Sequence, residues 1–364
     1  MKQGWKYKKL GEVCVSDLGK TLNSSKDKGE LRPYLCAVNV LWDKIDLSTL
    51  KETRFEEDEL ERYSVKKGDL LVCEGGDVGR AAIWNDEAVI QYQNALHRIR
   101  FNGEVIPRFC LFYLRHLKDN GTLDGRYAKG VTIKHLVKSS LLSIPIPVPS
   151  TEEQKAICSL LDKLNRVIEA KKEQLKELDK LAQAIFYDMF GDPITNNKGW
   201  NVAKVIDVVK LQRGYDLPVQ DRHSEGNIPI YGANGIVGYH TEAKAQYGII
   251  TGRSGSIGDV YMSKIPFWPL NTSLFSVDTH DNDIVFLMYL IRNYDLIRFK
   301  QGAGVPTLNR NSFHQNDIID VPLHFQQAFA EKVEAIERQK ELINQSIKDV
   351  QTLFDAKMDY YFGE

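Results

Sequence analysis

The sequence lacks the features that would assign it at once to a specialised class of protein. It has no excess charge of one sign, because 48 basic residues are matched by 49 acidic ones and the formal net charge is −1. A basic overall composition, typical of many nucleic-acid-binding domains, is therefore absent, and any surface of that kind must be local. No stretch approaches the roughly 18 consecutive apolar residues of a membrane-spanning helix, so we expect no membrane span.

Cysteine is also scarce. The five cysteines, at positions 14, 36, 73, 110 and 158, are odd in number and form no C-x-x-C pair. This argues against a disulfide framework or a zinc site and favours a reducing compartment. Residues 1–6 do not open the apolar run of a signal peptide, so we expect a cytoplasmic protein. The 364 residues are enough for two domains, each with its own core.

What the sequence has instead is an internal repeat. A glycine-rich block at residues 69–79 recurs at 248–258, and in both copies an apolar stretch, a polar turn and a second apolar stretch follow one another. Such an ordered series of matches predicts two copies of one structural plan. The other matched segments are 4–5 with 199–200, 94–96 with 271–274, 109–117 with 284–291, 130–132 with 304–307, 148–149 with 321–322, and 190–192 with 362–364.

Each copy contains a strand-rich part followed by a long helix. In the first part, brief apolar runs alternate with Gly, Asn, Asp and Pro, which predicts short strands. In the second part, apolar residues recur at alternating spacings of four and three, at nine of ten positions from Ile157 to Met189 and at eight of ten from Phe329 to Tyr361. This period, sustained for about five heptads, is typical of a coiled-coil seam. An amphipathic helix packed on one domain is the alternative.

An apolar seam needs a partner, because burying it is favourable. The simplest partner for one helix is the other, and the domain between them favours an antiparallel pair. The predicted fold class is α+β, with two β-rich domains joined by two long antiparallel helices that form a coiled coil, and with a pseudo-two-fold internal repeat. The predicted seam residues are Ile157, Leu161, Leu164, Ile168, Leu175, Leu178, Ile185, Val333, Ile336, Ile343, Ile347, Val350 and Phe354.

Local signals place the helix boundaries. A capping box is predicted at Ser150-x-x-Glu153 or at Thr151-x-x-Gln154, and Gly191 marks the end of the first helix. The second helix has no obvious Ser or Thr cap at its start. The predicted segments are 1–148, 149–190, 191–322 and 323–364.

No catalytic or metal-binding constellation is found. The glycine-rich turns lack the Lys of a P-loop, and strand signals follow them where a dinucleotide site needs a helix, so tight turns between strands are the favoured interpretation. The eight histidines show no metal-ligand spacing, and no G-x-S-x-G motif occurs. Asp192-Pro193-Ile194 does not fit the D/N-P-P-F/Y motif of an adenine methyltransferase. The sequence therefore favours recognition over reaction.

Several polar, partly basic loops are candidates for contact with nucleic acid. They lie at 20–28, 126–135, 212–215 and 298–311, and the glycine-rich turn at 253–256 adds an Arg and two Ser. These residue types bind phosphates and base edges, although solvated loops are the alternative. The candidate DNA-binding residues are Lys20, Asn23, Ser24, Lys26, Lys28, Arg126, Lys129, Thr132, Lys134, Gln212, Arg213, Tyr215, Arg253, Ser254, Ser256, Lys300, Thr307, Asn309 and Arg310.

The amino-acid sequences of four segments resemble those of one family. Residues 146–157 (IPVPSTEEQKAI), 190–200, 231–239 and 251–258 resemble blocks of the specificity subunit of type I restriction-modification systems, the HsdS family. The resemblance covers nearly the whole chain. Residues 321–327 depart from it, because the Glu-Glu-Gln form is altered there, so contacts at the start of the second helix are expected to differ.

The resemblance implies a function. Such a subunit reads a split, asymmetric double-stranded DNA target through two target recognition domains, here 1–148 and 191–322, and its conserved helices dock two methyltransferase subunits. The methyltransferase uses S-adenosylmethionine to methylate an adenine flipped from the stack, and restriction subunits using ATP and Mg are expected to join it. The chain itself would be non-catalytic, without a cofactor or metal. A coiled-coil scaffold that does not bind DNA, and an enzyme acting at the glycine-rich turns, are the alternatives.

Overall fold

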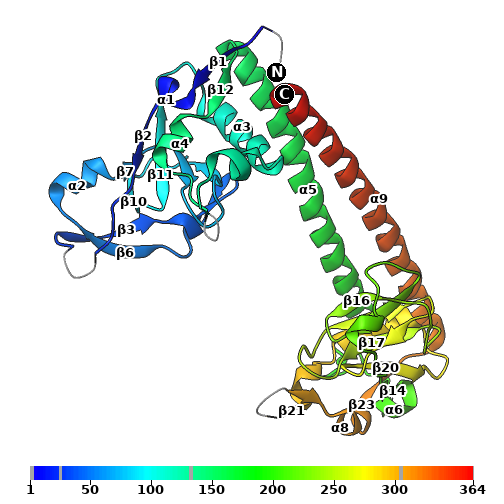
Figure 1. The fold of residues 1–364 in the computed structure, drawn as a ribbon. Helices are drawn as coiled ribbons and strands as arrows, with labels where there is room; N and C mark the ends of the chain where they lie inside the picture. The colour runs from blue at the N-terminus through cyan, green and yellow to red at the C-terminus, as the bar shows by residue number, and fades with distance from the viewer. Residues whose placement is uncertain (1–3, 24–26, 131–133, 303–305, 364) are drawn as a thin grey trace. The chain divides into compact units, whose positions relative to one another are not determined.

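The computed structural model describes residues 4–23, 27–130, 134–302 and 306–363. The chain divides into two compact units: unit 1 comprises Met1–Ala170 and Ile347–Glu364, and unit 2 comprises Lys171–Ser346 (Figure 1). Each unit combines a strand-rich body with about half of each of two long helices, α5 (Thr151–Phe190) and α9 (Leu323–Phe362).

The main sheet has the same strand order in both units. All neighbouring strands are antiparallel, and the glycine-rich block supplies a hairpin of the third and fourth strands in each unit. The predicted repeat is therefore a repeat of topology. The order in unit 1 is β2 (Cys14–Leu18), β11 (Leu96–Phe101), β8 (Leu70–Cys73), β9 (Ala81–Ile83), and in unit 2 it is β14 (Lys210–Arg213), β20 (Ser273–Asp278), β17 (Gly248–Gly252), β18 (Val260–Ser263).

A second sheet also recurs, with one strand fewer in unit 2. Each copy contains one parallel pair, β3 with β10 and β15 with β19, next to antiparallel neighbours. The order in unit 1 is β6 (Lys51–Phe55), β3 (Glu30–Leu35), β10 (Ile90–Tyr92), β7 (Ser64–Val65), and in unit 2 it is β16 (Gly235–His240), β15 (Ile228–Gly232), β19 (Trp268–Pro269).

Short elements complete the bodies. The helix that follows the main sheet is α3 (Pro107–Asp119) in unit 1 and α7 (Ile284–Arg292) in unit 2, and both are buried along most of their length. Two-stranded pairs join the start of each copy to the chain just before its long helix: β1 (Lys6–Lys9) with β12 (Pro145–Val148), and β13 (Asn201–Lys204) with β23 (Asp317–Asp320). The remaining helices and strands are α1 (Leu10–Val13), α2 (Glu57–Arg62), α4 (Lys138–Leu142), α6 (Val205–Val208), α8 (Arg310–His314), β4 (Val40–Leu41), β5 (Lys44–Ile45), β21 (Lys300–Gln301) and β22 (Thr307–Leu308), with 3-10 turns at Ala37–Asn39, Val219–Asp221 and Leu296–Phe299 and a π turn at Leu123–Tyr127.

The two long helices are antiparallel. In unit 1 the beginning of α5, at Ile157 and Leu161, shares a core with the end of α9, at Phe354. In unit 2 the end of α5, at Phe186, shares a core with the beginning of α9, at Phe329. Each helix has 40 residues and is therefore about 60 Å long. All thirteen predicted seam residues are buried or half-buried, and the predicted α+β fold class is confirmed.

The seam also packs on the strand-rich bodies. In unit 1, Phe354 lies against Phe112 of α3, with ring centroids 6.3 Å apart. In unit 2, Phe186 packs against Phe329 at 5.6 Å and against Phe286 of α7 at 6.3 Å. The two interpretations of the heptad pattern, a helix pair and a helix packed on a domain, are thus both realised at the ends of the helices.

Of the two capping boxes predicted for α5, the one at Ser150 forms. The Ser150 Oγ accepts from the Glu153 backbone N–H at 3.2 Å, and the Glu153 carboxylate accepts from the Ser150 backbone N–H at 3.1 Å. Gln154 is instead fully buried: its Oε1 accepts from the Ile106 N–H at 2.9 Å and its Nε2 donates to the Glu104 carbonyl at 2.7 Å. The side chain therefore fastens the start of α5 to the start of α3.

In unit 2, Gln326 fastens the start of α9 to the start of α7 in the same way. It is 1% exposed, its Oε1 accepts from the Asp283 N–H at 2.9 Å, and its Nε2 donates to the Val321 carbonyl at 2.7 Å. Asp283 caps α7. The altered sequence at 321–327 thus loses the Ser–Glu box and keeps the buried glutamine, which explains why both helices begin at matching positions.

Candidate nucleic-acid interface

A small polar hairpin in unit 2 pairs with the glycine-rich turn. Strands β21 and β22 place Gln301 opposite Thr307, and Ser254 of the turn forms a bridge to Thr307 on its other side. The Leu308 N–H donates to the Arg253 carbonyl at 2.8 Å. We call residues 253–255, 300–302 and 306–308 the polar ribbon of unit 2. Figure 1 shows β21 at the outer edge of this unit.

Unit 1 has an equivalent polar ribbon, formed by residues 74–75, 129–130 and 134–136. Lys129 and His135 exchange two backbone hydrogen bonds of 2.8 Å each, and Gly75 forms a bridge to His135. The Leu136 N–H donates to the Glu74 carbonyl at 2.7 Å. The two loops that the sequence places before the long helices are therefore anchored on the two glycine-rich turns, a pairing that the sequence alone does not show.

Each polar ribbon presents a row of three cross-strand residues, whose side chains lie on one face because directly paired residues do so. The row in unit 1 is Gly75, His135 and Lys129, and the row in unit 2 is Ser254, Thr307 and Gln301. A Cβ added at Gly75 would lie 3.2 Å from the imidazole of His135, so glycine leaves room for that ring. The two paired segments that project from each glycine-rich turn form a two-stranded ribbon, an element that fits the major groove of B-form DNA.

The glycines of the turns are there for steric reasons. A Cβ at Gly252 would come 1.7 Å from the Ser256 carbonyl oxygen, and Gly79 and Gly255 have φ of +81° and +88°, which favour glycine. Strands β9 and β18 follow the turns, as predicted, so the interpretation as tight turns between strands is confirmed.

The structure places most of the candidate residues in two groups on the surface, apart from the buried Lys20. Those at or next to the polar ribbons are Arg126, Lys129, Lys134, Arg253, Ser254, Ser256, Lys300, Thr307, Asn309 and Arg310, all exposed or half-buried. Those elsewhere on the bodies are Asn23, Lys28, Gln212, Arg213 and Tyr215, also exposed or half-buried. Ser24, Lys26 and Thr132 lie outside the described residues.

Lys20 differs from the other candidates because it is buried. It is 5% exposed, and its Nζ lies 2.6 Å from the Glu59 carboxylate and donates to the Arg54 carbonyl at 2.8 Å. The ammonium also lies 5.0 Å from the centre of the Phe55 ring. Its charge is neutralised inside unit 1, so the Lys20 ammonium is not available at the surface to contact DNA.

The segment around Gln212, Arg213 and Tyr215 forms a separate site in unit 2. A cavity lined by Gln212 and Tyr215 also includes Tyr247 and Phe275. Ser254 and Ser256 line a different cleft, together with residues that the sequence did not single out: Arg222, Asn234 and Asn271. The candidates in unit 2 thus do not converge on one pocket.

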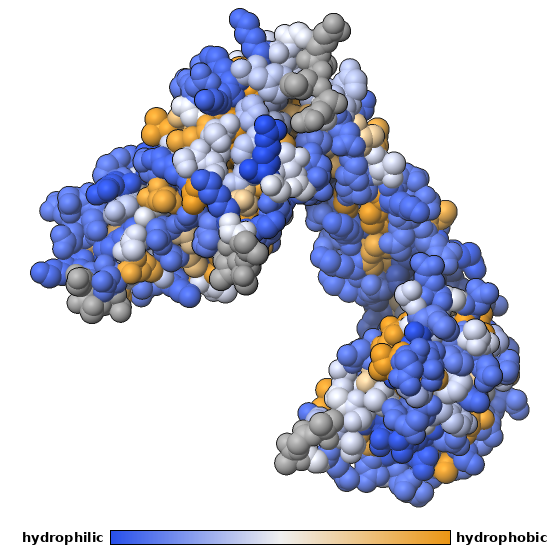
Figure 2. Space-filling model, in the orientation of Figure 1, coloured by the Kyte–Doolittle hydropathy of each residue, from blue (hydrophilic) through white to orange (hydrophobic). Residues whose placement is uncertain are grey.

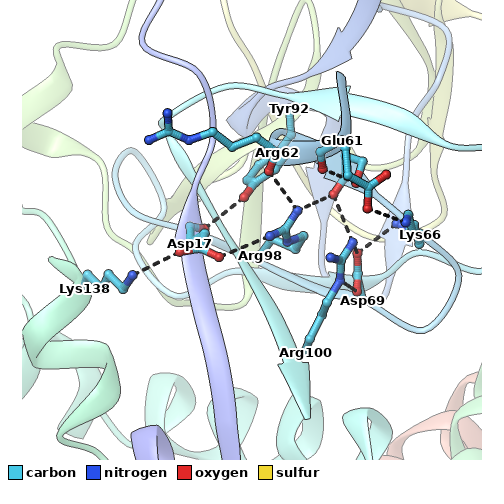
Figure 3. A network of polar contacts seen from close by, with 10 residues as sticks. Asp17, Glu61, Arg62, Lys66, Asp69, Tyr92, Arg98, Arg100 and Lys138 are labelled. Carbon is cyan, nitrogen blue, oxygen red and sulfur yellow. Dashed lines mark hydrogen bonds and ion pairs between the residues drawn. The ribbon is translucent and has the colours of Figure 1, made fainter. Parts of the chain in front are cut away.

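In unit 1, several basic side chains form hydrogen bonds and ion pairs with other groups of the same unit (Figure 3). Arg98 of β11 is 6% exposed and joins the Asp17 carboxylate, at 3.2 Å, to the Ser64 carbonyl, at 2.6 Å. Arg100 forms two hydrogen bonds with Asp69, of 2.8 and 2.9 Å, and these raise the pKa of the guanidinium above its ordinary value. Because β2, β7 and β11 are joined in this way, these arginines stabilise the contact between the two sheets.

The described residues contain no cluster of three or more His, Cys, Asp and Glu side chains suited to a metal ion. Nor does any helix within the described ranges combine the length and the apolarity needed to cross a membrane. The five cysteines are all buried and unbridged, and burial raises the pKa of the Cys73 thiol to about 11. On the face drawn in Figure 2, hydrophilic residues cover most of both units.

The sequence matches the family of type I restriction modification DNA specificity domains over residues 2–180 and 197–352, and the chain belongs to this family. The two matched regions correspond to the two copies of the repeat, so the family assignment and the topology agree.

Particular relatives were found by sequence and by structure. The chain is 28% identical over 174 residues to the type I restriction enzyme MjaIX specificity subunit of Methanocaldococcus jannaschii, covering 44% of this chain and 40% of that protein. It is 29% identical over 227 residues to the MjaVIII specificity subunit of the same organism, covering 58% and 51%. These alignments thus span only about half of the relatives' own length.

Two solved structures share the fold over nearly the whole chain. The S subunit of a type I restriction-modification system from M. genitalium aligns with a TM-score of 0.60 at 16% identity, covering 98% of this chain and 95% of that one. A chain from a study of complex assembly and conformational transition of the type I R-M system aligns with a TM-score of 0.64 at 16% identity, covering 99% and 98%.

Proposed function

We propose that the chain is the DNA sequence-specificity subunit of a type I restriction-modification complex and that it is not itself catalytic. The observation that carries the proposal is the pair of polar ribbons, which share one backbone framework and present different side chains. Two DNA-contacting surfaces with different side chains, built on the same repeated backbone, are suited to a double-stranded DNA target whose two halves differ in sequence. The proposal also places the protein in the cytoplasm.

In this proposal the residues next to the ribbons have two kinds of role. Arg126, Lys129 and Lys134 in unit 1, and Lys300 and Arg310 in unit 2, contact phosphates, which fix the register of the protein on the duplex. The polar side chains of the rows contact base edges in the major groove. Segments 1–148 and 191–322 are the two target recognition domains, and segments 149–190 and 323–364 are the two helical regions between and after them.

The long helices are the proposed docking surface for two adenine methyltransferase subunits, and restriction subunits are proposed to join the same complex. S-adenosylmethionine would bind in the methyltransferase, and ATP and Mg in the restriction subunit. This chain would supply position and sequence selection, while the methyltransferase flips and methylates the adenine.

The test is to assemble the chain with its methyltransferase subunits and to sequence the modified adenines in DNA exposed to the complex. We expect methylation within one bipartite sequence that has two different halves. Methylation without sequence preference would refute the proposed role, and the absence of salt-dependent DNA affinity in the complex would favour a scaffold that does not bind DNA.

A further inference from the structure

One side chain of the unit 2 row is held in a single orientation by its neighbours. Gln301 is exposed on β21, and its Oε1 accepts from the Nδ2 of Asn309 at 3.0 Å. Asn309 is the N-cap of α8, and its Oδ1 accepts from the Ser312 backbone N–H at 3.0 Å. The three groups form a short chain of hydrogen bonds that runs from the backbone to the surface.

The backbone N–H of Ser312 determines which atoms donate and which accept in this series of hydrogen bonds. A backbone N–H can only donate, so the Asn309 atom facing Ser312 must be the oxygen, and the nitrogen of the same amide must face Gln301. Asn309 then donates, and Gln301 must accept through its oxygen. The Nε2 of Gln301 is left pointing away, and no group among the described residues accepts a hydrogen bond from it.

We propose that Gln301 is a base-reading residue of unit 2, set by Asn309 to act as a hydrogen-bond donor and therefore to select guanine. This inference rests on the proposed function. Guanine presents two neighbouring acceptors in the major groove, O6 and N7, which can receive the two hydrogens of one amide nitrogen. Adenine places an amino group where guanine has O6, cytosine offers only a donor, and thymine offers a single acceptor, O4, so guanine alone can receive both hydrogens of the amide nitrogen.

Asn309 is a positioning residue in this scheme, and unit 1 has no counterpart to it. The matching N-cap, before α4, is Val137, which has no capping side chain, and the matching position in the row is Lys129. An amide with its nitrogen turned outward in this way is therefore a property of unit 2, and its loss should change one half of the target.

The test uses the full chain assembled with its methyltransferase subunits and selects bound duplexes from a randomised DNA pool. Three variants separate the roles: Gln301→Ala, Asn309→Ser and Asn309→Asp. Ser and Asp both preserve the N-cap of α8, so they keep the local fold while changing what Gln301 faces. Unfolding curves of each variant check that the fold is kept.

We expect Gln301→Ala to reduce the preference for guanine at one position of one half-site by about tenfold. Asn309→Ser should relax the same position, since Gln301 is then free to rotate. Asn309→Asp should reverse the preference, because its carboxylate accepts from the Gln301 nitrogen and turns the oxygen outward, towards the amino group of cytosine or adenine.

Two outcomes count against the inference in different ways. If the wild-type complex selects a bipartite sequence and Gln301→Ala leaves every position unchanged, the inference is wrong and the proposed function stands. If the wild-type complex selects no sequence, the proposed function fails and the inference fails with it.

Discussion

The row on the polar ribbon of unit 1 is Gly75, His135 and Lys129, whereas the row in unit 2 is Ser254, Thr307 and Gln301. The ribbons are held by backbone hydrogen bonds to the glycine-rich turns, and such bonds do not depend on which side chains point outward. The framework can therefore stay constant while the row changes. One row offers an ammonium and an imidazole, and the other offers hydroxyls and an amide, so two different readers can arise from one repeated plan.

Changes to the buried contacts that both units share should therefore lower the stability of the two units alike. Changes to the residues of a row should affect the recognition of one half-site only. The largest expected effect comes from the aromatic contacts that join the long helices to the bodies. Phe354→Ala in unit 1 and Phe186→Ala in unit 2 each remove a fully buried ring and should lower the free energy of unfolding by about 3–5 kcal/mol. Denaturant unfolding followed by circular dichroism measures the loss.

Tyr360→Ala is the control, because Tyr360 lies on α9 and is 61% exposed. It should change stability far less than either phenylalanine variant. A large loss for one phenylalanine and none for the other would show that the two units do not share one framework.

The next effect concerns the buried glutamines. Gln154→Leu and Gln326→Leu each leave a half-buried backbone N–H, of Ile106 or of Asp283, without its partner. Each variant should cost about 1–3 kcal/mol of stability, and the two costs should be similar. Unfolding measurements on the matched pair test this, with Gln351→Leu, at a half-buried position of α9, as the control. Unequal costs would mean that the two helix starts are fastened differently.

Much of the framework could be predicted from the sequence because its signals are periodic. The heptads of both helices and the box at Ser150 depend on residues close together in the chain, and the repeat is visible as two stretches of similar sequence. The pairing of Gly75 with His135, and the burial of Gln154, depend on contacts between distant segments, which leave no local pattern. The sequence therefore predicts the polar loops and does not predict the ribbons that these loops form.

The burial of Lys20 shows a related difficulty. A lysine between polar residues predicts a solvated or DNA-contacting side chain, yet here Glu59 and the Arg54 carbonyl satisfy the ammonium inside unit 1. Arg98 and Arg100 are used in the same way. A net charge near zero therefore says little about the surface, because part of the basic charge is paired within the bodies.

A smaller effect should distinguish the charged row from the neutral one. Lys129→Ala removes a cation from the ribbon of unit 1, so the slope of log affinity against log salt should fall by about 1 if the ammonium contacts a phosphate. Gln301→Ala removes no charge and should leave the slope unchanged. Titrations of the assembled complex with its DNA target at several salt concentrations measure both. Equal slopes for the two variants would contradict a phosphate contact by Lys129.

The smallest effect concerns pH and again separates the two units. His97 of β11 is fully buried, its Nε2 donates to the Leu136 carbonyl at 2.6 Å, and its Nδ1 has no recorded partner in the described structure. Burial lowers the pKa of His97 below its ordinary value. At the matching position of β20, unit 2 has Leu274, which is also buried.

The direction of the pH dependence follows from the lowered pKa of His97. Below a pH of about 6.5 the unfolded chain binds a proton at residue 97 more readily than the folded chain does. The contribution of His97 to the free energy of unfolding is therefore present above that pH and is lost as the pH falls. His97→Leu, which copies unit 2, should weaken this loss between about pH 7 and 5, although it also removes the hydrogen bond to Leu136. His116 and His314, whose pKa values are also lowered by burial, should keep part of the dependence. Unfolding midpoints at several pH values test this, and an unchanged slope in the variant would show that His97 takes up no additional proton on unfolding and that its pKa is not lowered in the folded protein.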